Sequence, residues 1–331
     1  MLQGLLRRTQ TGDRSVEAGE SSPAAAGRPS IGLALGGGAA RGFAHIGVLQ
    51  TLLAHGLKPD VVAGTSMGAV IGGCYAAGEL DDIAAWARGL TRRRILGYLD
   101  VSLAGSGLIS GGRLARRLEA SIGRSKIEAL DTRFAAIATE IDTGHEVWLT
   151  RGRLLEALRA SYALPGVFAP VRVGGRWLVD GALVNPVPVS AARALGARLV
   201  IGVSTNADLF GRGSTIFSHG FDEDEEPAGA DPASERRWRG KLGVQKFLKR
   251  QLVGSEGRPG LPKVMIEAYN VMQDRITRAR LAGDPADIMI SPRVGHIGMF
   301  DFHCAEEAIR LGAEAAEKAL ETIDEASKAL A

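Results

Sequence analysis

A serine with a glycine two residues before it and another two residues after it lies between an apolar run and a small-residue stretch. The pentapeptide GTSMG places Ser66 between Gly64 and Gly68, after the apolar run 61–63 and before the helical stretch 69–77. The chain has 44 glycines, so the pentapeptide alone is weak evidence and its flanks carry the argument. Glycines at these positions let a strand and a helix approach closely around a sharply presented hydroxyl. We therefore expect an α/β unit with Ser66 as a candidate nucleophile.

A glycine-rich loop lies upstream, between a strand expected at 31–35 and a helix expected over 41–55. Its sequence is Gly36-Gly37-Gly38-Ala39-Ala40-Arg41-Gly42, and Gly56 ends the helix. The free N–H groups and the dipole at a helix N-terminus attract anions. The loop is therefore expected to bind either a nucleotide phosphate or the oxyanion of an acyl-transfer intermediate.

The residues of the loop favour the oxyanion. A dinucleotide fingerprint needs a third glycine where this chain has Arg41, and the chain has no phosphate-binding GxxxxGK[ST] loop. The strand before Ser66 also lacks the terminal acid of that fingerprint. A cation in the first turn of a helix opposes its dipole, so we expect an anionic partner for Arg41, either a bound group or a structural carboxylate.

A third element ends in an acid. Residues 176–179 read as a strand, followed by Asp180, Gly181 and Ala182. An acid at the carboxyl end of a strand in a parallel sheet lies at the edge where ligands bind. Ser66 and the glycine loop are expected at the same edge, which makes Asp180 a candidate partner for the serine rather than a plain turn residue.

These three motifs, in this order, resemble the patatin-like phospholipases, and most closely the bacterial members of that family of lipid acyl hydrolases. The resemblance covers most of residues 30–205 and includes the segment 160–171. It implies a Ser66–Asp180 catalytic dyad, with Ser66 as nucleophile. It also implies an oxyanion hole from the amides around Gly37, Gly38 and Ala39, with Arg41 nearby. Many members have glycine at the position of Ala39; the alanine is tolerable if its φ is negative and strained if its φ is positive.

Two other interpretations stay open. A Ser-His-Asp triad is possible in chain order, because His219, His296 and His303 all follow Asp180. None of the three lies in a context that marks a base, and His45 and His55 read as packing or capping residues. Alternatively, the scaffold could be a non-catalytic lipid-binding or regulatory protein that keeps these residues as structure.

The alternation of apolar runs and helical stretches predicts the fold class. Strand-like runs fall at 31–35, 61–63, 134–139, 176–179, 199–203 and 287–290, and helical stretches at 41–55, 67–77, 79–89, 111–122, 154–162 and 187–195. A closing helix is expected over 303–328. This pattern predicts an α/β protein, a three-layer α/β/α sandwich around a largely parallel sheet, as the resemblance also implies. Residues 30–325 would form the acyl hydrolase domain.

Residues 1–29 lack periodicity and are expected to be a disordered tail. Their apolar run is too short for a signal peptide, and no segment reaches the ~18 apolar residues of a spanning helix. Cys74 and Cys304 are the only cysteines and lack metal-ligand spacing. We therefore expect reduced cysteines, no metal, no cofactor and a cytoplasmic protein.

The segment 207–262 interrupts the α/β rhythm and is predicted to be a charged insertion. It is acidic over 222–226 and then basic, with a loosely amphipathic pattern around Trp238, Leu242 and Leu248. Such a segment could act as a lid, make a peripheral contact with an anionic membrane, or remain a solvated helix. The expected partner is a lipid ester. A formal net charge of +3 is too small to indicate nucleic-acid binding.

Overall fold

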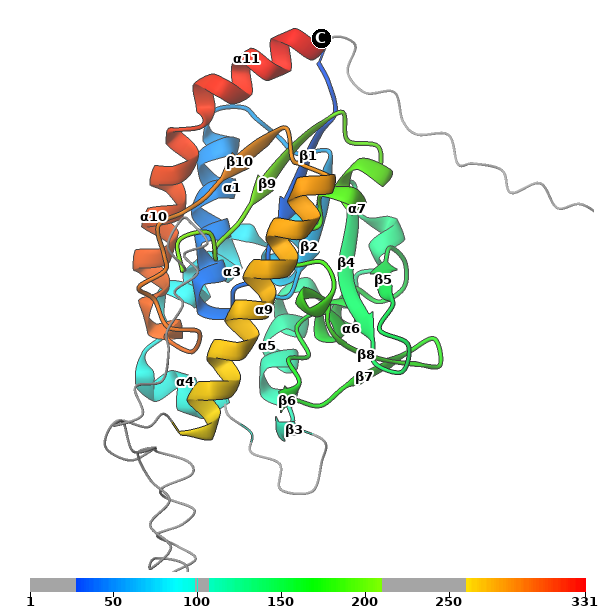
Figure 1. The fold of residues 1–331 in the computed structure, drawn as a ribbon, viewed down its shortest axis with the longest axis vertical. Helices are drawn as coiled ribbons and strands as arrows, with labels where there is room; N and C mark the ends of the chain where they lie inside the picture. The colour runs from blue at the N-terminus through cyan, green and yellow to red at the C-terminus, as the bar shows by residue number, and fades with distance from the viewer. Residues whose placement is uncertain (1–27, 99, 101–106, 210–259) are drawn as a thin grey trace, which may run out of the picture.

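The computed structural model describes residues 28–98, 100, 107–209 and 260–331 (Figure 1). The predicted tail up to residue 27 lies outside these ranges. So does most of the predicted insertion 207–262, with the lid and membrane roles that we attached to it.

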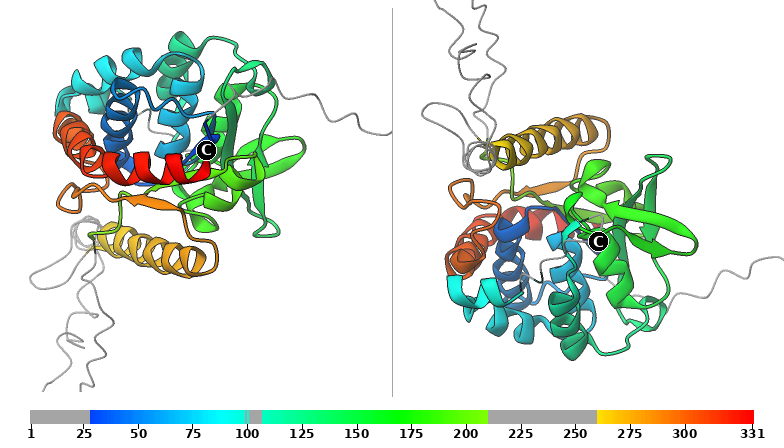
Figure 2. Two further views of the ribbon diagram at one scale, coloured as in Figure 1. Left: turned by 90° about the horizontal axis from the view of Figure 1, so that it is seen from above. Right: turned by 90° about the horizontal axis from the view of Figure 1, so that it is seen from below.

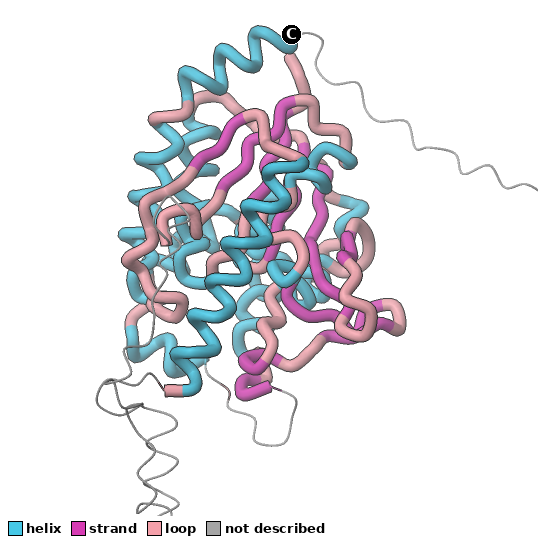
Figure 3. The backbone as a smooth tube through the Cα atoms, in the orientation of Figure 1, coloured by secondary structure: helices cyan, strands magenta, loops and turns pink. Residues whose placement is uncertain are grey.

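An eight-stranded sheet forms the centre of the molecule (Figures 1 and 3). Five strands are parallel, in the order β10 (Ile288–Ile290), β9 (Leu199–Val203), β1 (Ile31–Leu35), β2 (Val61–Thr65) and β4 (Arg133–Glu140). Beyond them, β5 (Glu146–Leu149) and β8 (Arg176–Asp180) run antiparallel to β4, and β7 (Val171–Val173) pairs with β8. A separate parallel pair joins β3 (Gly107–Ile109) to β6 (Gly166–Phe168).

Helices cover both faces of the sheet, as the three-layer prediction requires (Figure 2). Alternate residues of β1 enter two separate cores: Leu33 and Leu35 pack into one, and Ala34 packs into the other. The larger core is built with α1 (Ala44–Ala54), α2 (Met67–Ala76), α3 (Leu80–Arg88), α4 (Arg92–Tyr98), α5 (Gly112–Ile122), α6 (Leu154–Ser161), α10 (Ala305–Glu317) and α11 (Leu320–Leu330). The smaller core is built with α7 (Val189–Ala194) and the C-terminal end of α9 (Leu261–Gly283). The predicted fold class is confirmed.

Two glycines let α1 and α10 cross in contact (Figure 1). A Cβ at Gly47 would lie 1.9 Å from the carbonyl oxygen of Ile309, and one at Gly312 would lie 2.0 Å from that of Ala44. Neither position has room for a side chain, because the obstacles are backbone atoms. The backbone of α1 is thus held directly against that of α10.

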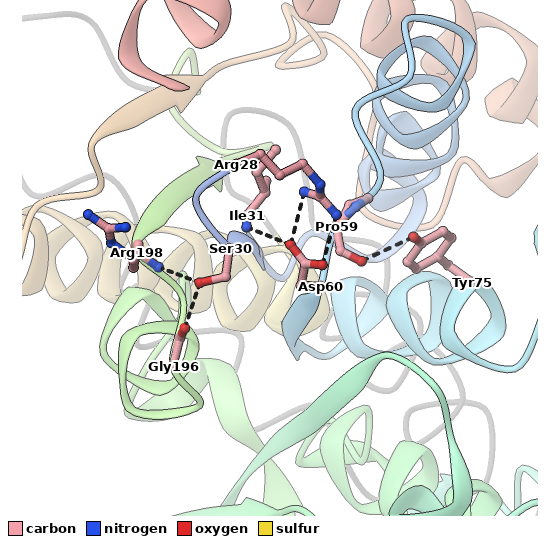
Figure 4. Close-up of polar contacts among 8 residues, drawn as sticks. All are labelled: Arg28, Ser30, Ile31, Pro59, Asp60, Tyr75, Gly196 and Arg198. Carbon is pink, nitrogen blue, oxygen red and sulfur yellow. Dashed lines mark hydrogen bonds and ion pairs between the residues drawn. The ribbon is translucent and has the colours of Figure 1, made fainter. Parts of the chain in front are cut away.

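Side chains fasten the amino-terminal edge of the sheet (Figure 4). Ser30 Oγ donates to the carbonyl of Gly196 at 2.8 Å and accepts from the amide of Arg198 at 3.1 Å. The Asp60 carboxylate accepts from Arg28 and, at 2.8 Å, from the amide of Ile31. This edge is opposite to the one at which β2 delivers Ser66.

Some elements differ from the prediction. The expected helix 303–328 is a 3₁₀ turn, η5 (Phe302–Cys304), followed by α10 and α11, which are separated at residues 318–319. The break lets α11 turn so that Ile323 is buried in the larger core. The expected helix 41–55 starts as a 3₁₀ segment, η1 (Ala39–Phe43). Helices α4 and α9 and strands β3, β5, β6 and β7 were not predicted. No helix in the described ranges is long and apolar enough to cross a bilayer.

Candidate active site

Ser66 occupies a strained turn between β2 and α2. Its backbone has φ 55° and ψ −121°, a region that residues other than glycine rarely adopt. The turn is tight because both motif glycines touch backbone: a Cβ at Gly68 would lie 2.1 Å from the carbonyl oxygen of Leu35, and one at Gly64 would lie 2.5 Å from Cα of Ala69. The glycines therefore permit the turn, and the turn places the hydroxyl at the carboxyl end of the sheet, where it lines the cavity.

A buried serine on α6 fixes this turn. The amide of Ser66 donates to Ser161 Oγ at 2.9 Å, and that hydroxyl donates to the carbonyl of Ile137 on β4 at 2.6 Å. One hydroxyl thus ties the backbone of the nucleophile to the neighbouring strand. The sequence reasoning assigned no role to Ser161, although it lies in the segment 160–171 that contributed to the family resemblance.

The structure brings Ser66 and Asp180 together. Ser66 Oγ donates to Asp180 Oδ2 at 2.7 Å, and Asp180 Oδ1 accepts from the amide of Ala182 at 2.8 Å. The backbone of Asp180 is held by Ala163 and Thr139, each at 2.9 Å. Close packing of Gly181 keeps the turn against β4, because a Cβ there would lie 2.3 Å from the carbonyl oxygen of Ile137.

The reason that placed Asp180 at this edge needs correction. We expected β8 to end there as a parallel strand, but it runs antiparallel to β4. Strand β4 continues past the end of β2, which stops beside Ile137. Strand β8 pairs with this overhang from Glu140 back to Ala138, which lies opposite Asp180. Asp180 therefore lies at this edge because β8 pairs with β4 beyond the end of β2 and runs back toward it.

Burial sets the protonation of Asp180. Desolvation raises its pKa to about 6, against the opposing effects of the Ala182 amide, the Ser66 hydroxyl and the nearby Tyr269 hydroxyl. The carboxyl is therefore largely ionised at neutral pH, with a pKa closer to the operating range of a general base than that of a free aspartate.

The glycine loop offers two free amides rather than the three that we expected. Gly36 donates to Val203 and Gly37 to Pro186, each at 3.0 Å, so the Gly37 amide is committed to the scaffold and is removed from the predicted oxyanion hole. Within the described residues, the amides of Gly38 and Ala39 have no hydrogen-bond acceptor, and both residues line the pocket beside Ser66.

Side chains hold the carbonyls of the loop. Thr205 Oγ1 donates to the carbonyl of Gly37 at 2.7 Å. His45 Nε2 lies 2.7 Å from the carbonyl of Gly36, so this nitrogen carries the hydrogen. Burial lowers the pKa of His45 to about 4, which keeps the ring neutral. His45 is thus a support of the loop, in keeping with the packing role that we expected.

Ala39 has a positive φ, the conformation that we expected to be strained. Its φ is 48°, so alanine stands in a conformation that glycine adopts without cost. The last motif glycine, Gly42, lies where η1 touches α2, and a Cβ there would lie 2.4 Å from Cγ of Met67. The loop and the nucleophile turn are therefore in direct contact.

Arg41 is engaged with α9 rather than with the pocket. Its side chain is buried, and Nη2 donates to Asn270 Oδ1 on α9 at 3.0 Å. Burial lowers the pKa of the guanidinium to about 10, and the charges of Asp208 and Glu267 partly offset this effect. The expected acids are therefore near Arg41, but it is not among the residues that line the pocket.

The histidines named for a triad are engaged elsewhere or lie outside the description. His296 Nε2 is 3.0 Å from Glu307 Oε1. His303 Nε2 accepts from Arg92 at 3.3 Å, and its Nδ1 is 3.9 Å from Asp301. Neither ring is paired with Ser66 or Asp180. His219 lies outside the described residues.

An apolar cavity of about 140 Å³ opens beside the Ser66 hydroxyl. Ser66, Asp180, Gly38 and Ala39 form its polar end. The rest of the wall is largely apolar and comes from several helices and from the segment before α10: Val70, Trp86, Leu90, Ile95, Leu114, Leu118, Phe168, Met299 and Phe302. The site thus joins a hydroxyl–carboxylate pair and two free amides to a hydrophobic cavity.

Helix α9 adds two residues that sequence reasoning missed. Tyr269 and Gln273, one turn apart, both line the cavity. Gln273 Oε1 accepts from Asn206 Nδ2 at 2.7 Å. The hydroxyl of Tyr269 is buried and makes no well-formed hydrogen bond to a described residue, yet it lies near enough to Asp180 to lower the pKa of that carboxyl. No local motif marks these residues, because they meet the site only through the fold.

Comparison with known proteins places the chain in a family. The sequence model of the patatin-like phospholipases matches residues 33–193, which span the glycine loop, Ser66 and Asp180. The chain is 35% identical to an uncharacterised NTE family protein of Mycobacterium tuberculosis over 89% of this chain and 92% of that one. It is 26% identical to lysophospholipase NTE1 of Pyricularia oryzae, over 86% of this chain and 18% of that one.

Among solved structures, VipD of Legionella pneumophila resembles the chain with a TM-score of 0.47 and 13% identity, over 89% of this chain and 67% of VipD. The sequence matches are much closer and decide the assignment. The chain belongs to the patatin-like phospholipase family, beside relatives that carry the NTE family name.

Proposed function

We propose that the protein is a serine hydrolase that cleaves carboxylic esters of lipids, of the phospholipase or lysophospholipase type, through a Ser66–Asp180 dyad. The observation that carries the proposal is the 2.7 Å hydrogen bond from Ser66 Oγ to a buried carboxylate. The free amides of Gly38 and Ala39 beside it, and the membership of the family, support the same reading.

In the acylation step, Asp180 Oδ2 takes the proton of Ser66 as Oγ attacks the ester carbonyl carbon. The carbonyl electron pair moves to oxygen, and the resulting oxyanion accepts hydrogen bonds from the Gly38 and Ala39 amides. When the intermediate collapses, the bond to the alcohol oxygen breaks and the proton on Asp180 passes to that oxygen. The products are a free alcohol and an acyl group esterified to Ser66.

Deacylation repeats these steps with water. Asp180 accepts a proton from the water as its oxygen attacks the acyl carbon, and the same amides hold the second oxyanion. Collapse returns the proton to Ser66 Oγ and releases a fatty acid. No step calls for a metal or a cofactor.

The cavity supports a lipid acyl chain as the substrate group. Its wall beyond the dyad is almost entirely apolar, and an acyl chain buried there gains about 0.8 kcal/mol for each methylene removed from water. The hydrolase domain is proposed to comprise residues 30–325, since most described elements of this range belong to the eight-stranded sheet or pack in its two cores.

Loss of the nucleophile tests the proposal. Ser66→Ala should abolish hydrolysis of p-nitrophenyl octanoate and labelling by a fluorophosphonate probe. Ser30→Ala removes a hydroxyl from the opposite edge and should keep both. Full hydrolysis by Ser66→Ala would refute the proposal, and an unlabelled wild type would favour a non-catalytic lipid-binding protein. Loss of activity on substituting His219, His296 or His303 would favour the triad.

A further inference from the structure

The hydroxyl of Tyr269 is a buried polar atom at the reacting end of the cavity. Among the described residues it has no well-formed hydrogen-bond partner, although buried hydroxyls in proteins normally have one. Tyr269 lines the cavity together with Ser66 and Asp180, and α9, which carries it, packs against the turn after Asp180. The Tyr269 hydroxyl also lies close enough to Asp180 to lower the pKa of that carboxyl, so it is placed beside the catalytic base and can donate to a group that enters the cavity there.

The chemistry of the dyad indicates which reacting oxygen lies near Tyr269. A base that takes the proton of the nucleophile must later give it to the alcohol oxygen, so this oxygen has to lie next to Asp180 during collapse. The Gly38 and Ala39 amides hold the other oxygen, the oxyanion. A donor that faces Asp180 from within the cavity therefore faces the departing alcohol.

The neighbours of Tyr269 keep it a donor. Burial and the charge of Asp180 raise the pKa of the phenol well above its ordinary value, so it remains protonated. Gln273, one helical turn away, lies close enough to lower that pKa by hydrogen bonding and is itself fixed by Asn206. Because Asn206 already donates to Gln273 Oε1, the group of Gln273 left for the phenol is its NH2, which can donate to the phenol oxygen but cannot take the phenol hydrogen.

We propose that Tyr269 is a catalytic residue whose hydroxyl donates a hydrogen bond to the alcohol oxygen as the tetrahedral intermediate collapses. The acyl carbon–oxygen bond breaks, its electron pair goes to the alcohol oxygen, and Asp180 returns to that oxygen the proton taken from Ser66. Tyr269 keeps its own proton and stabilises the charge that builds up during this transfer. The inference rests on the proposed ester hydrolysis.

The dependence on the leaving group separates this role from a purely structural one. A p-nitrophenolate is a stable anion and leaves without help, whereas an alkoxide needs a proton and a donor. We therefore compare kcat/KM for p-nitrophenyl octanoate and ethyl octanoate, which share the acyl chain, in the wild type and in Tyr269→Phe. The variant should lose about 10- to 100-fold on the ethyl ester and less than about threefold on the nitrophenyl ester.

Two variants serve as controls. Tyr162→Phe removes another buried phenol hydroxyl from the cavity lining, on the α6 side, and should leave the ratio of the two rates unchanged. Ser66→Ala should abolish both reactions. Tyr269→Phe should unfold at the temperature of the wild type, because the lost hydroxyl has no well-formed partner within the described structure.

The outcomes are distinct. A selective loss on the ethyl ester supports the assignment of Tyr269. An equal loss on both esters, or no loss on either, overturns it while leaving the proposed function in place if Ser66→Ala is inactive. Activity that persists in Ser66→Ala overturns the proposed function itself and the role of Tyr269 with it.

Discussion

The guanidinium of Arg41 donates to the side-chain oxygen of Asn270 at 3.0 Å, and this bond joins the glycine loop to α9. Both side chains are buried. The loop supplies the free amides of Gly38 and Ala39, and α9 supplies Tyr269. Arg41 therefore links two walls of one site without reaching into it.

Breaking this link should impair catalysis more than folding. Arg41→Met keeps the apolar stem and removes the donor, so the loop amides lose an anchor that positions them. We expect kcat/KM for p-nitrophenyl octanoate to fall about 10- to 100-fold. The free energy of unfolding should change little, because leaving Asn270 unpaired is offset by removing a buried cation. Asn270→Asp retains an acceptor and should keep most of the activity; an equally damaged Asn270→Asp would contradict this explanation.

Activity should fall on acidification with the titration of Asp180. The dyad needs an ionised carboxylate, and burial raises the pKa of Asp180 to about 6. Below that pH, kcat/KM should decrease about tenfold per pH unit, and above it the profile should level off. A pH–rate profile of the wild type measures this limb directly. An acid limb near pH 4 would mean that the carboxyl titrates like an exposed aspartate.

The ionised Asp180 carboxylate should also lower the free energy of unfolding, because it is buried. Between about pH 4 and pH 6 the folded chain keeps a proton on Asp180 that the unfolded chain has released, so folding becomes less favourable as the pH rises through this window. Asp180→Asn removes this titration. The variant should be more stable than the wild type by up to about 3 kcal/mol at pH 8, and the difference should vanish near pH 4.

Urea unfolding of Asp180→Asn and wild type at the two pH values measures the effect. The titration of His45 cancels in the comparison because both proteins contain it. An Asp180→Asn protein that is less stable than the wild type at pH 8 would show that the buried charge is compensated.

Ser161 and Ser30 form a natural pair for testing the nucleophile turn. Each hydroxyl donates to a carbonyl and accepts from an amide. Ser161 is buried beside Ser66, whereas Ser30 is partly exposed, and Figure 4 shows its contacts. Ser161→Ala leaves a buried amide and a buried carbonyl unpaired and should cost about 2 kcal/mol or more. Ser30→Ala should cost under about 1 kcal/mol, because water replaces the hydroxyl. Equal costs would exclude a special role of Ser161.

Replacing Ala39 by glycine should not lower stability, whereas the same replacement of an ordinary helical alanine should. At a φ of 48°, Ala39→Gly relieves about 1–2 kcal/mol of backbone strain and loses somewhat less through the greater freedom of the unfolded chain. The variant should be as stable as the wild type or slightly more stable. Ala85→Gly, at an exposed position of α3, should lose about 1 kcal/mol. Thermal unfolding of the two variants distinguishes these signs.

The predictions that were confirmed, the family and the α/β/α fold class, depend on short segments. The strand before Ser66 and the small-residue helix after it are adjacent in the chain, so their pattern is readable locally. The direction of β8 is not local: it depends on which part of β4 is free to pair. The commitment of the Gly37 amide to Pro186 is equally invisible, because the two residues meet only when β1 and the segment before α7 are assembled.

Helix α9 escaped prediction for a different reason. Its face toward the site carries the polar residues Asn270, Gln273 and Asp274, whereas Met265 and Met272 on the other side are exposed. This distribution inverts the usual amphipathic pattern, in which apolar residues mark the buried face. A search for hydrophobic periodicity therefore passes over the helix that carries Tyr269.

The contact of Gly47 with α10 also bears on how the chain acquires its final form. Helix α1 continues directly from the glycine loop, and its backbone is seated against a helix made much later in synthesis. Contacts between such distant segments form slowly during folding. The glycine loop and α1 are synthesised early, but α10, which supports them, is synthesised late. A nascent chain that has not yet emerged from the ribosome as far as Gly312 should therefore be unable to turn over substrate.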